Sequence, residues 1–285
     1  MLNSPTFNNL EHLAGSGDAE KVFEALRQLP LKDLGELLLD ADRAPSALRN
    51  ILPRMASDEV QRNWTGTSGH ALLKQSLSFV ETVASTYASI TGKPLDGARI
   101  LDYGCGWGRL IRLMYKFSSP TLIYGCDAWD MSLDLCKKSG ILAHLDKCEE
   151  VPVEAPFPGT EFDLIYAFSV FTHLSERTAK AVMSSLRRRV SPDGLAVITI
   201  RPLKYWDAHD PSQNLANIAK MKQSHLSYGY AFTPHVRAPI DGDITYGDTS
   251  MTVDYIAKNW AGWSVATEKS NAADPYQQLV FLKPV

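Results

Sequence analysis

The chain has 285 residues, of which 45% are hydrophobic and 21% are charged. This length suffices for one large domain, or for a domain with an extension, that buries its core without disulfides or metals. Lys and Arg number 29 and Asp and Glu number 32, so the formal net charge is −3. A protein that binds DNA or RNA through its overall charge needs a basic excess or a clustered basic face, so we expect no nucleic-acid partner.

Three further classes of protein are disfavoured. The first twenty residues contain no Lys or Arg and no apolar stretch, which argues against a secretory signal. The longest strongly apolar run, residues 164–171, is too short to span a membrane. The four cysteines show no Cys-x-x-Cys pairing, so neither a disulfide framework nor a zinc site is indicated. We therefore expect a cytoplasmic protein with no membrane span and no bound metal.

The first sixty residues have the apolar spacing of short helices. The pattern is carried by Val22, Phe23, Leu26 and Leu29, then by Leu34, Leu37 and Leu38, and after Pro45 by Leu48, Ile51 and Leu52. This predicts a helical extension over residues 1–63. Because the extension holds no cluster of titratable groups, we give it a packing role or a role in forming a homo-oligomer.

From residue 98 the pattern alternates between short apolar strands and helices. Strands are expected at 98–102, 122–126, 162–168, 194–200, 263–267 and 278–282, and helices at 110–117, 131–138, 175–190 and 252–260. Before them, residues 64–70 have the composition of a loop, and a long helix follows to about residue 91. Such alternation predicts an α/β fold with a parallel sheet that binds ligands beyond the carboxyl ends of its strands.

The sharpest motif is a glycine-rich loop between the first strand and its helix, Asp102-Tyr103-Gly104-Cys105-Gly106-Trp107-Gly108. It fits neither the Gly-x-Gly-x-x-Gly dinucleotide pattern nor a P-loop. The carboxylate of Asp102 would repel a pyrophosphate, but it suits a ligand with a sulfonium and an ammonium group, such as S-adenosylmethionine. The next strand ends at Asp127, where an acidic side chain can accept hydrogen bonds from ribose hydroxyls.

These motifs, together with the segments 161–175 and 186–194, resemble the class I S-adenosylmethionine-dependent methyltransferases over about residues 64–285. The resemblance implies a Rossmann-like fold with a seven-stranded sheet whose last strand is antiparallel. It implies S-adenosylmethionine as cofactor and S-adenosylhomocysteine as product. It also implies that the acceptor site is built by the segment at about 201–250, which interrupts the regular pattern.

The resemblance also assigns residues to the cofactor. Gly104 and Gly106 would pass under its methionine part, Asp102 would hold the amino end and Ser169 would face the methyl donor. Asp127 would take the ribose. The full predicted set is Trp64, Asp102, Gly104, Gly106, Arg109, Asp127, Ala128, Trp129 and Ser169. The residue that contacts the adenine amino group falls somewhere in 146–151 and stays unassigned.

On the acceptor side, His173 follows the fourth strand and is predicted to be the general base for a hydroxyl acceptor, or else a residue that shapes the pocket. His235 and His70, both expected in loops, are the alternative bases. Arg201, Tyr205, His235 and Tyr246 are predicted to line the acceptor site, because aromatic and polar groups suit a sugar or an aromatic ring. We therefore expect methyl transfer to a hydroxyl or amine of a small molecule or glycan. The alternatives are methylation of a natural-product scaffold and cofactor binding without transfer.

Overall fold

The computed structural model describes residues 5–208 and 215–285, so six positions of the predicted acceptor segment, 209–214, lie outside it. The chain divides into two compact units, one that ends at Lys147 and one that runs from Cys148 to Val285. The predicted extension, residues 1–63, belongs to the first unit together with the glycine loop.

The strands confirm the predicted fold class, an α/β fold with a seven-stranded sheet. In chain order they are β1 (Ile100–Tyr103), β2 (Ile123–Asp127), β3 (His144–Lys147), β4 (Phe162–Ala167), β5 (Val190–Ile200), β8 (Trp263–Lys269) and β9 (Gln278–Pro284). The order across the sheet is β3-β2-β1-β4-β5-β9-β8. β1, β2 and β3 pair in parallel, as do β4 and β5, whereas β9 is antiparallel to both β5 and β8. The last strand is thus antiparallel, as expected.

The first unit contains most of the described helices, and capping residues fix the start of one and the end of another. Its helices are α1 (Pro5–Gly15), α2 (Ala19–Leu26), α3 (Leu31–Leu39), η1 (Ala41–Arg43), α4 (Ser46–Arg49), α5 (Asp58–Thr65), α6 (Gly69–Thr91), α7 (Ile111–Met114), η2 (Pro120–Leu122) and α8 (Asp130–Lys138). Asp18 caps α2 by accepting a hydrogen bond from the Lys21 N–H, and Gly92, with φ of 71°, ends α6 in the left-handed conformation.

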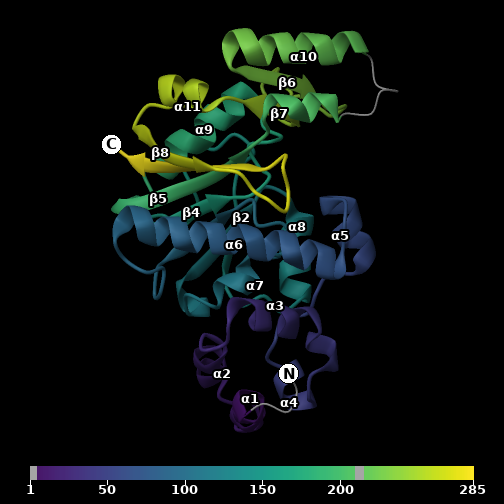
Figure 1. The fold of residues 1–285 in the computed structure, drawn as a ribbon, viewed down its shortest axis with the longest axis vertical. Coiled ribbons are helices and arrows are strands. Elements are labelled where there is room, and N and C mark those ends of the chain that lie inside the picture. The colour runs from purple at the N-terminus through teal and green to yellow at the C-terminus, as the bar shows by residue number, and fades with distance from the viewer. Residues whose placement is uncertain (1–4, 209–214) are drawn as a thin grey trace. The chain divides into compact units, whose positions relative to one another are not determined.

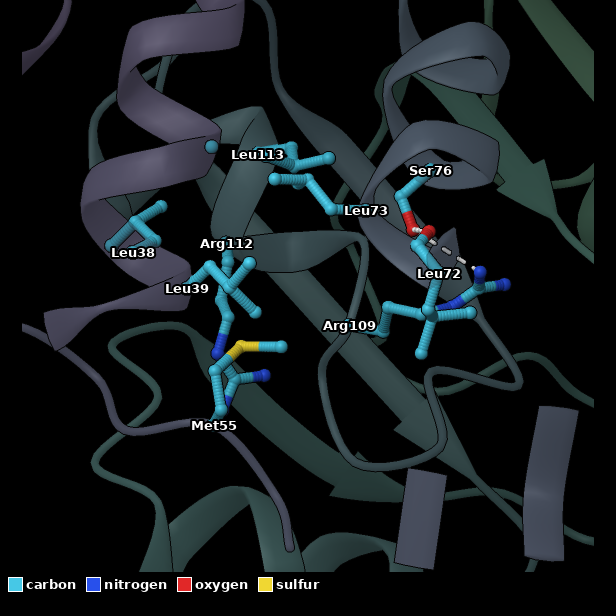
Figure 2. A pocket seen from close by; sticks show the side chains of 10 residues that line it. Leu38, Leu39, Met55, Leu72, Leu73, Ser76, Arg109, Arg112 and Leu113 are labelled. Carbon is cyan, nitrogen blue, oxygen red and sulfur yellow. Dashed lines mark hydrogen bonds between the residues drawn. The ribbon is translucent and has the colours of Figure 1, made fainter. Parts of the chain in front are cut away.

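The N-terminal helices pack into the same core as the glycine loop. A Cβ on Gly35 of α3 would lie 2.9 Å from Leu73 Cδ1 on α6, so the two helices approach closely at this glycine. Beside this contact lies an apolar pocket of about 20 Å³, lined from α3, α6 and α7 and by Met55 (Figure 2). A space of this size holds about one water molecule, so it is a packing defect and not a ligand site.

A buried arginine joins the extension to the glycine loop. Arg112 is 2% exposed, and its guanidinium donates to the carbonyls of Trp107 (3.0 Å), Gly108 (2.9 Å) and Arg54. Its charge also lies over the Trp107 ring at 4.8 Å. Burial lowers the pKa of Arg112 to about 10, so the group stays charged at neutral pH. Three carbonyl dipoles therefore stabilise a buried cation between residue 54 and the loop.

The second unit contains the two helices predicted at 175–190 and 252–260, together with regular structure between them that the sequence pattern did not indicate. Its helices are α9 (Glu176–Arg187), η3 (Leu203–Asp207), α10 (Leu215–Tyr228) and α11 (Val253–Asn259), and β6 (Tyr230–Pro234) pairs with β7 (Gly247–Met251) as an antiparallel ribbon. α10 lies along this ribbon (Figure 1). Trp206, 1% exposed, donates to Ser250 Oγ at 2.7 Å and fixes η3 to β7. The predicted acceptor segment is thus a small packed substructure.

Two smaller differences concern the first unit. β3 was not recognised as a strand because its four residues are short of apolar side chains and mostly exposed. Trp64 and Thr65 form the last turn of α5 and not a loop, and the loop begins at Gly66, whose φ is 78°.

No helix within residues 5–208 and 215–285 is long and apolar enough to cross a membrane. The long helix α6 has 23 residues but carries polar side chains along its length.

Candidate cofactor and acceptor sites

The glycine loop that follows β1 is held by main-chain hydrogen bonds to the end of β2. The Cys126 carbonyl accepts from the N–H groups of Gly104 (2.8 Å) and Cys105 (2.9 Å). Gly104, Gly106 and Gly108 have φ values of 76°, 56° and 77°, a region that glycine enters without steric cost. The loop therefore needs glycine at these positions for its path alone, and this path brings main chain to the surface of the site.

Asp127, the last residue of β2, fastens this loop. Its Oδ2 accepts from the Gly106 N–H at 2.9 Å and its Oδ1 from the Trp129 N–H at 2.9 Å. Burial raises the pKa of this carboxyl, against the opposing effect of those hydrogen bonds. A carboxylate offers about four lone-pair positions, so Asp127 retains capacity for donors from a ligand.

Trp64 completes this site from α5. A Cβ on Gly106 would lie 3.6 Å from the Trp64 ring, and the ring meets Trp129 edge-to-face with centroids 6.4 Å apart. The structure therefore brings together Trp64, Gly106, Asp127 and Trp129 from the predicted cofactor set. The others in the loop region follow from chain position: Asp102 is buried in β1, Gly104 opens the loop, and Ala128 lies between Asp127 and Trp129.

Arg109, also predicted to contact the cofactor, has a partner on α6. Its Nη1 donates to Ser76 Oγ at 3.2 Å, and its side chain is among those that line the small apolar pocket (Figure 2). This contact accounts for Arg109 structurally, and a cofactor contact remains a prediction.

In the second unit, Ser169 lies just beyond β4 with a φ of 60°, an uncommon conformation for a residue other than glycine. Its N–H donates to Thr199 Oγ1 at 2.7 Å, and its Oγ accepts from Gln277 Nε2 at 2.9 Å. Residues held in this region cost about 1–3 kcal/mol each and cluster at functional sites. Gln277 was not predicted; it is 7% exposed and its Oε1 has no partner among the described residues.

His173 is partly buried, and both of its ring nitrogens are engaged. Nδ1 is 2.8 Å from the Gly247 carbonyl and must donate to it, which leaves Nε2 to accept from Arg201 Nη2 at 3.2 Å. The ring stacks on Tyr246, with centroids 4.9 Å apart and planes at 7°. Burial and the neighbouring Arg201 charge lower the pKa of His173 to about 4, so the ring is neutral at pH 7.

A carboxylate that the sequence did not single out, Asp248 on β7, connects the predicted acceptor residues. It accepts hydrogen bonds from Arg201 Nη1 (2.6 Å), Tyr205 OH (3.0 Å) and His235 Nε2 (3.0 Å). Burial opposes its ionisation, but the donors of His235 and Arg201 prevail and lower the pKa of Asp248 to about 2. We call this group of residues, with His173 and Tyr246, the Asp248 network.

The charges within this network are balanced. Arg201 is 8% exposed, donates also to the Thr172 carbonyl at 2.8 Å, and lies over the Tyr205 ring at 4.0 Å. Arg237, which follows β6, is paired with Glu150 at 2.7 Å. The two arginines therefore have carboxylate partners within the protein, and the network as a whole presents neutral hydrogen-bonding groups and aromatic faces.

Comparison with known proteins agrees with this architecture. Residues 101–198 match the family described as "Methyltransferase domain". A solved S-adenosylmethionine-dependent methyltransferase from Clostridium acetobutylicum has the same fold, with a TM-score of 0.50, 11% identity, and coverage of 79% of this chain and 96% of that one. The chain thus has the Rossmann-like fold of this methyltransferase, and its residues 101–198 match a methyltransferase domain family.

Curated relatives are methyltransferases that match part of the chain. Sterol 24-C-methyltransferase of Schizosaccharomyces pombe is 24% identical over 148 residues, which are 50% of this chain and 38% of that protein. Ubiquinone biosynthesis O-methyltransferase of Brucella anthropi is 29% identical over 111 residues, 37% of this chain and 42% of that protein. The chain therefore spans about two-fifths of the length of these curated relatives.

Proposed function

We propose that this protein transfers the methyl group of S-adenosylmethionine to a hydroxyl group of a small molecule, with sugars and glycans among the candidate acceptors. The observation that carries the proposal is the glycine loop clamped by Asp127, in a chain that matches the methyltransferase family. S-adenosylhomocysteine would be the product.

The chemistry of the loop residues fits this cofactor. Asp102 and Asp127 place two acidic groups at the ends of adjacent strands, which suits a ligand with an ammonium group and two ribose hydroxyls. The positive φ of Gly106 and the Trp64 ring beside it form an aromatic and main-chain surface. The basic side chains nearby are engaged within the protein, Arg109 by Ser76 Oγ and Arg112 by main-chain carbonyls.

When bound, S-adenosylmethionine supplies an activated methyl group on a sulfonium. The chain's own residues would bind and orient the cofactor and exclude water from the reacting groups. Asp127 would hold the ribose, Gly104 and Gly106 would lie along the methionine part, and Trp129 would cover the adenine. Ser169, fixed in its strained conformation by Thr199 and Gln277, would border the methyl group. Such positioning accounts for most of the rate gain in a displacement of this kind.

The Asp248 network would receive the acceptor. Its aromatic rings and balanced charges favour a neutral, polar or aromatic molecule over an anionic one. The named relatives act in sterol C-methylation and in O-methylation during ubiquinone biosynthesis, and both names support a small-molecule acceptor.

Calorimetric titration of the whole chain with S-adenosylmethionine and S-adenosylhomocysteine tests the cofactor. A methyl-transfer assay with a tritiated methyl group tests the reaction. Binding of both ligands, with transfer to a hydroxyl-bearing acceptor, is the expected result. Binding without transfer to any acceptor would leave a cofactor-binding protein, and absence of binding would refute the proposal.

A further inference from the structure

We propose that His235, oriented by Asp248, accepts the proton of the acceptor hydroxyl. This inference rests on the proposed methyl transfer and names the chemical class of its acceptor. It reassigns the base role that the sequence gave to His173, and it adds Asp248 as a positioning residue.

His173 is poorly arranged to take a proton. Its one unprotonated nitrogen, Nε2, already accepts from the Arg201 guanidinium, a permanent cation. A proton added at Nε2 would therefore lie against the guanidinium charge, at the short distance of the present hydrogen bond. The ring is partly buried, so little water is present to screen this repulsion. His173 instead fixes Arg201 and stacks on Tyr246, which is the role of a positioning residue.

His235 has the opposite arrangement. Its Nε2 lies 3.0 Å from Asp248 Oδ2, and an ionised carboxylate can only accept, so Nε2 carries the hydrogen. In the neutral form of the ring the lone pair is therefore on Nδ1, which has no hydrogen-bond partner among the described residues. The side chain is 46% exposed, so an incoming hydroxyl can reach it, whereas that of His173 is 19% exposed.

Asp248 suits the positioning role because it stays ionised. Arg201 and Tyr205 donate to Oδ1, while His235 occupies Oδ2. The carboxylate fixes the tautomer of His235 and would stabilise the imidazolium that forms when the ring takes a proton, as in other Asp–His pairs. The edge of Tyr246, with ring centroids 5.5 Å apart, limits rotation of the imidazole.

An oxygen lone pair of the acceptor forms the new bond to the methyl carbon, and the carbon–sulfur bond breaks with its electron pair left on sulfur. The hydroxyl proton passes to Nδ1 of His235, which becomes an imidazolium beside Asp248. Loss of that proton to water restores the neutral ring.

The first test reads the tautomers directly, without turnover. Long-range proton–nitrogen NMR spectra of the whole protein should show hydrogen on Nε2 of His235 and on Nδ1 of His173. An Asp248→Asn variant should release the tautomer preference of His235. If that variant fails to fold, Tyr205→Phe, which removes one donor to Asp248 and leaves His235 bound, should keep the preference. Hydrogen on Nδ1 of His235 in the wild type would overturn the inference.

The second test measures transfer from tritiated S-adenosylmethionine to catechol and methyl α-glucopyranoside as hydroxyl probes, and to benzylamine as an amine probe. His235→Gln keeps a donor for Asp248 but removes the base. It should lower hydroxyl methylation by roughly 10²–10⁴-fold, the usual size of general-base catalysis, with unchanged cofactor affinity. His12→Gln, at an exposed histidine of α1, is the control and should leave turnover unchanged.

The outcomes separate this inference from the proposed function. Unchanged hydroxyl methylation in His235→Gln, or an equal loss of cofactor affinity, would overturn the base role while methyl transfer stands. Transfer to benzylamine alone would overturn the hydroxyl acceptor. A wild-type protein that binds cofactor and methylates none of the three probes would count against the proposed function, and the inference would fall with it.

Discussion

The proposed cofactor site and the proposed acceptor site differ in the groups that form them. In the first unit, main-chain groups of one short loop are held by the end of β2, and a single side chain, Asp127, fastens them. In the second, five separated segments contribute side chains to the Asp248 network. A site made of main-chain groups can be predicted from one local sequence motif. A network of side chains forms only after segments that are distant in the sequence have packed together.

The largest effect should come from breaking the buried ion pair of the network. Arg201→Met would leave the Asp248 carboxylate without its closest cation and should cost about 3–5 kcal/mol of unfolding free energy. Denaturant unfolding measures this loss. The double variant Arg201→Met with Asp248→Asn removes both charges and should recover much of it. If both proteins were equally destabilised, the pair would not act as a unit.

The glycine loop should fail for a steric reason instead. In Gly108→Ala the new Cβ would lie 2.8 Å from Ile141 Cγ1, at a φ of 77°. Overpacking and the left-handed conformation together should cost about 2–4 kcal/mol. Gly97→Ala, with a φ of 69° and open space around it, is the matched control and should lose only about 1–2 kcal/mol. Equal losses would show that Ile141 yields freely.

The network should also make stability depend on pH. The pKa of His173 falls from 6.5 to about 4 on folding, because burial and Arg201 disfavour the charged ring. The unfolded state then binds the extra proton between those values, so stability is full above pH 6.5 and is lost as the pH falls towards 4. The loss should reach about 3 kcal/mol. Unfolding free energies measured across this range should show the slope, and His173→Gln should flatten it.

A smaller effect is expected at the clamp of the glycine loop. Asp127→Ala removes the acceptor for the Gly106 and Trp129 N–H groups, together with the predicted ribose contact. Cofactor affinity should fall by about 1–3 kcal/mol, the scale for polar partners left unpaired. Asp130→Ala, at an exposed carboxylate three residues on, is the calorimetric control. Unchanged affinity in Asp127→Ala would remove the ribose assignment.

The smallest change in stability is expected for a substitution at Gln277. Its Oε1 is buried without a described partner, so Gln277→Met should alter stability by no more than about 1 kcal/mol. If a ligand donor meets that oxygen, affinity for cofactor or acceptor should fall roughly tenfold, the equivalent of one neutral hydrogen bond. Titration of both ligands would show which one depends on Gln277, and no change in either would make it a purely structural support for Ser169.

These contrasts explain what the sequence could predict. The alternation of apolar strands and helices was enough for the α/β fold, and the glycines were enough for the loop. The sequence assigned Asp127 a ribose contact, whereas its hydrogen bond to the Gly106 N–H is seen only in the structure. β3 was not predicted because its side chains are mostly exposed and show little hydrophobic pattern. The ribbon of β6 and β7 escaped because its residues mix turn formers with aromatic groups.

For the proposed acceptor site, the sequence predicted His173, Arg201, Tyr205, His235 and Tyr246, and in the structure all five lie in one network. Asp248 was missed because a single acidic residue among small polar ones has no spacing signal. Its importance comes from donors that lie 13 to 47 residues away in the chain. The hydrogen bonds that distinguish His235 from His173 depend on that same folding.

The buried guanidinium of Arg112 has a consequence for chimeric proteins. Because it donates to carbonyls on both sides, at residue 54 and in the glycine loop, the two segments share one cation. A foreign helical segment grafted ahead of residue 64 must present a carbonyl to the same donor. Without it, the graft leaves a dehydrated cation under the loop. A single arginine thus limits which N-terminal segments can be exchanged between relatives. A successful chimera would take the segment around residue 54 and residue 112 from the same parent.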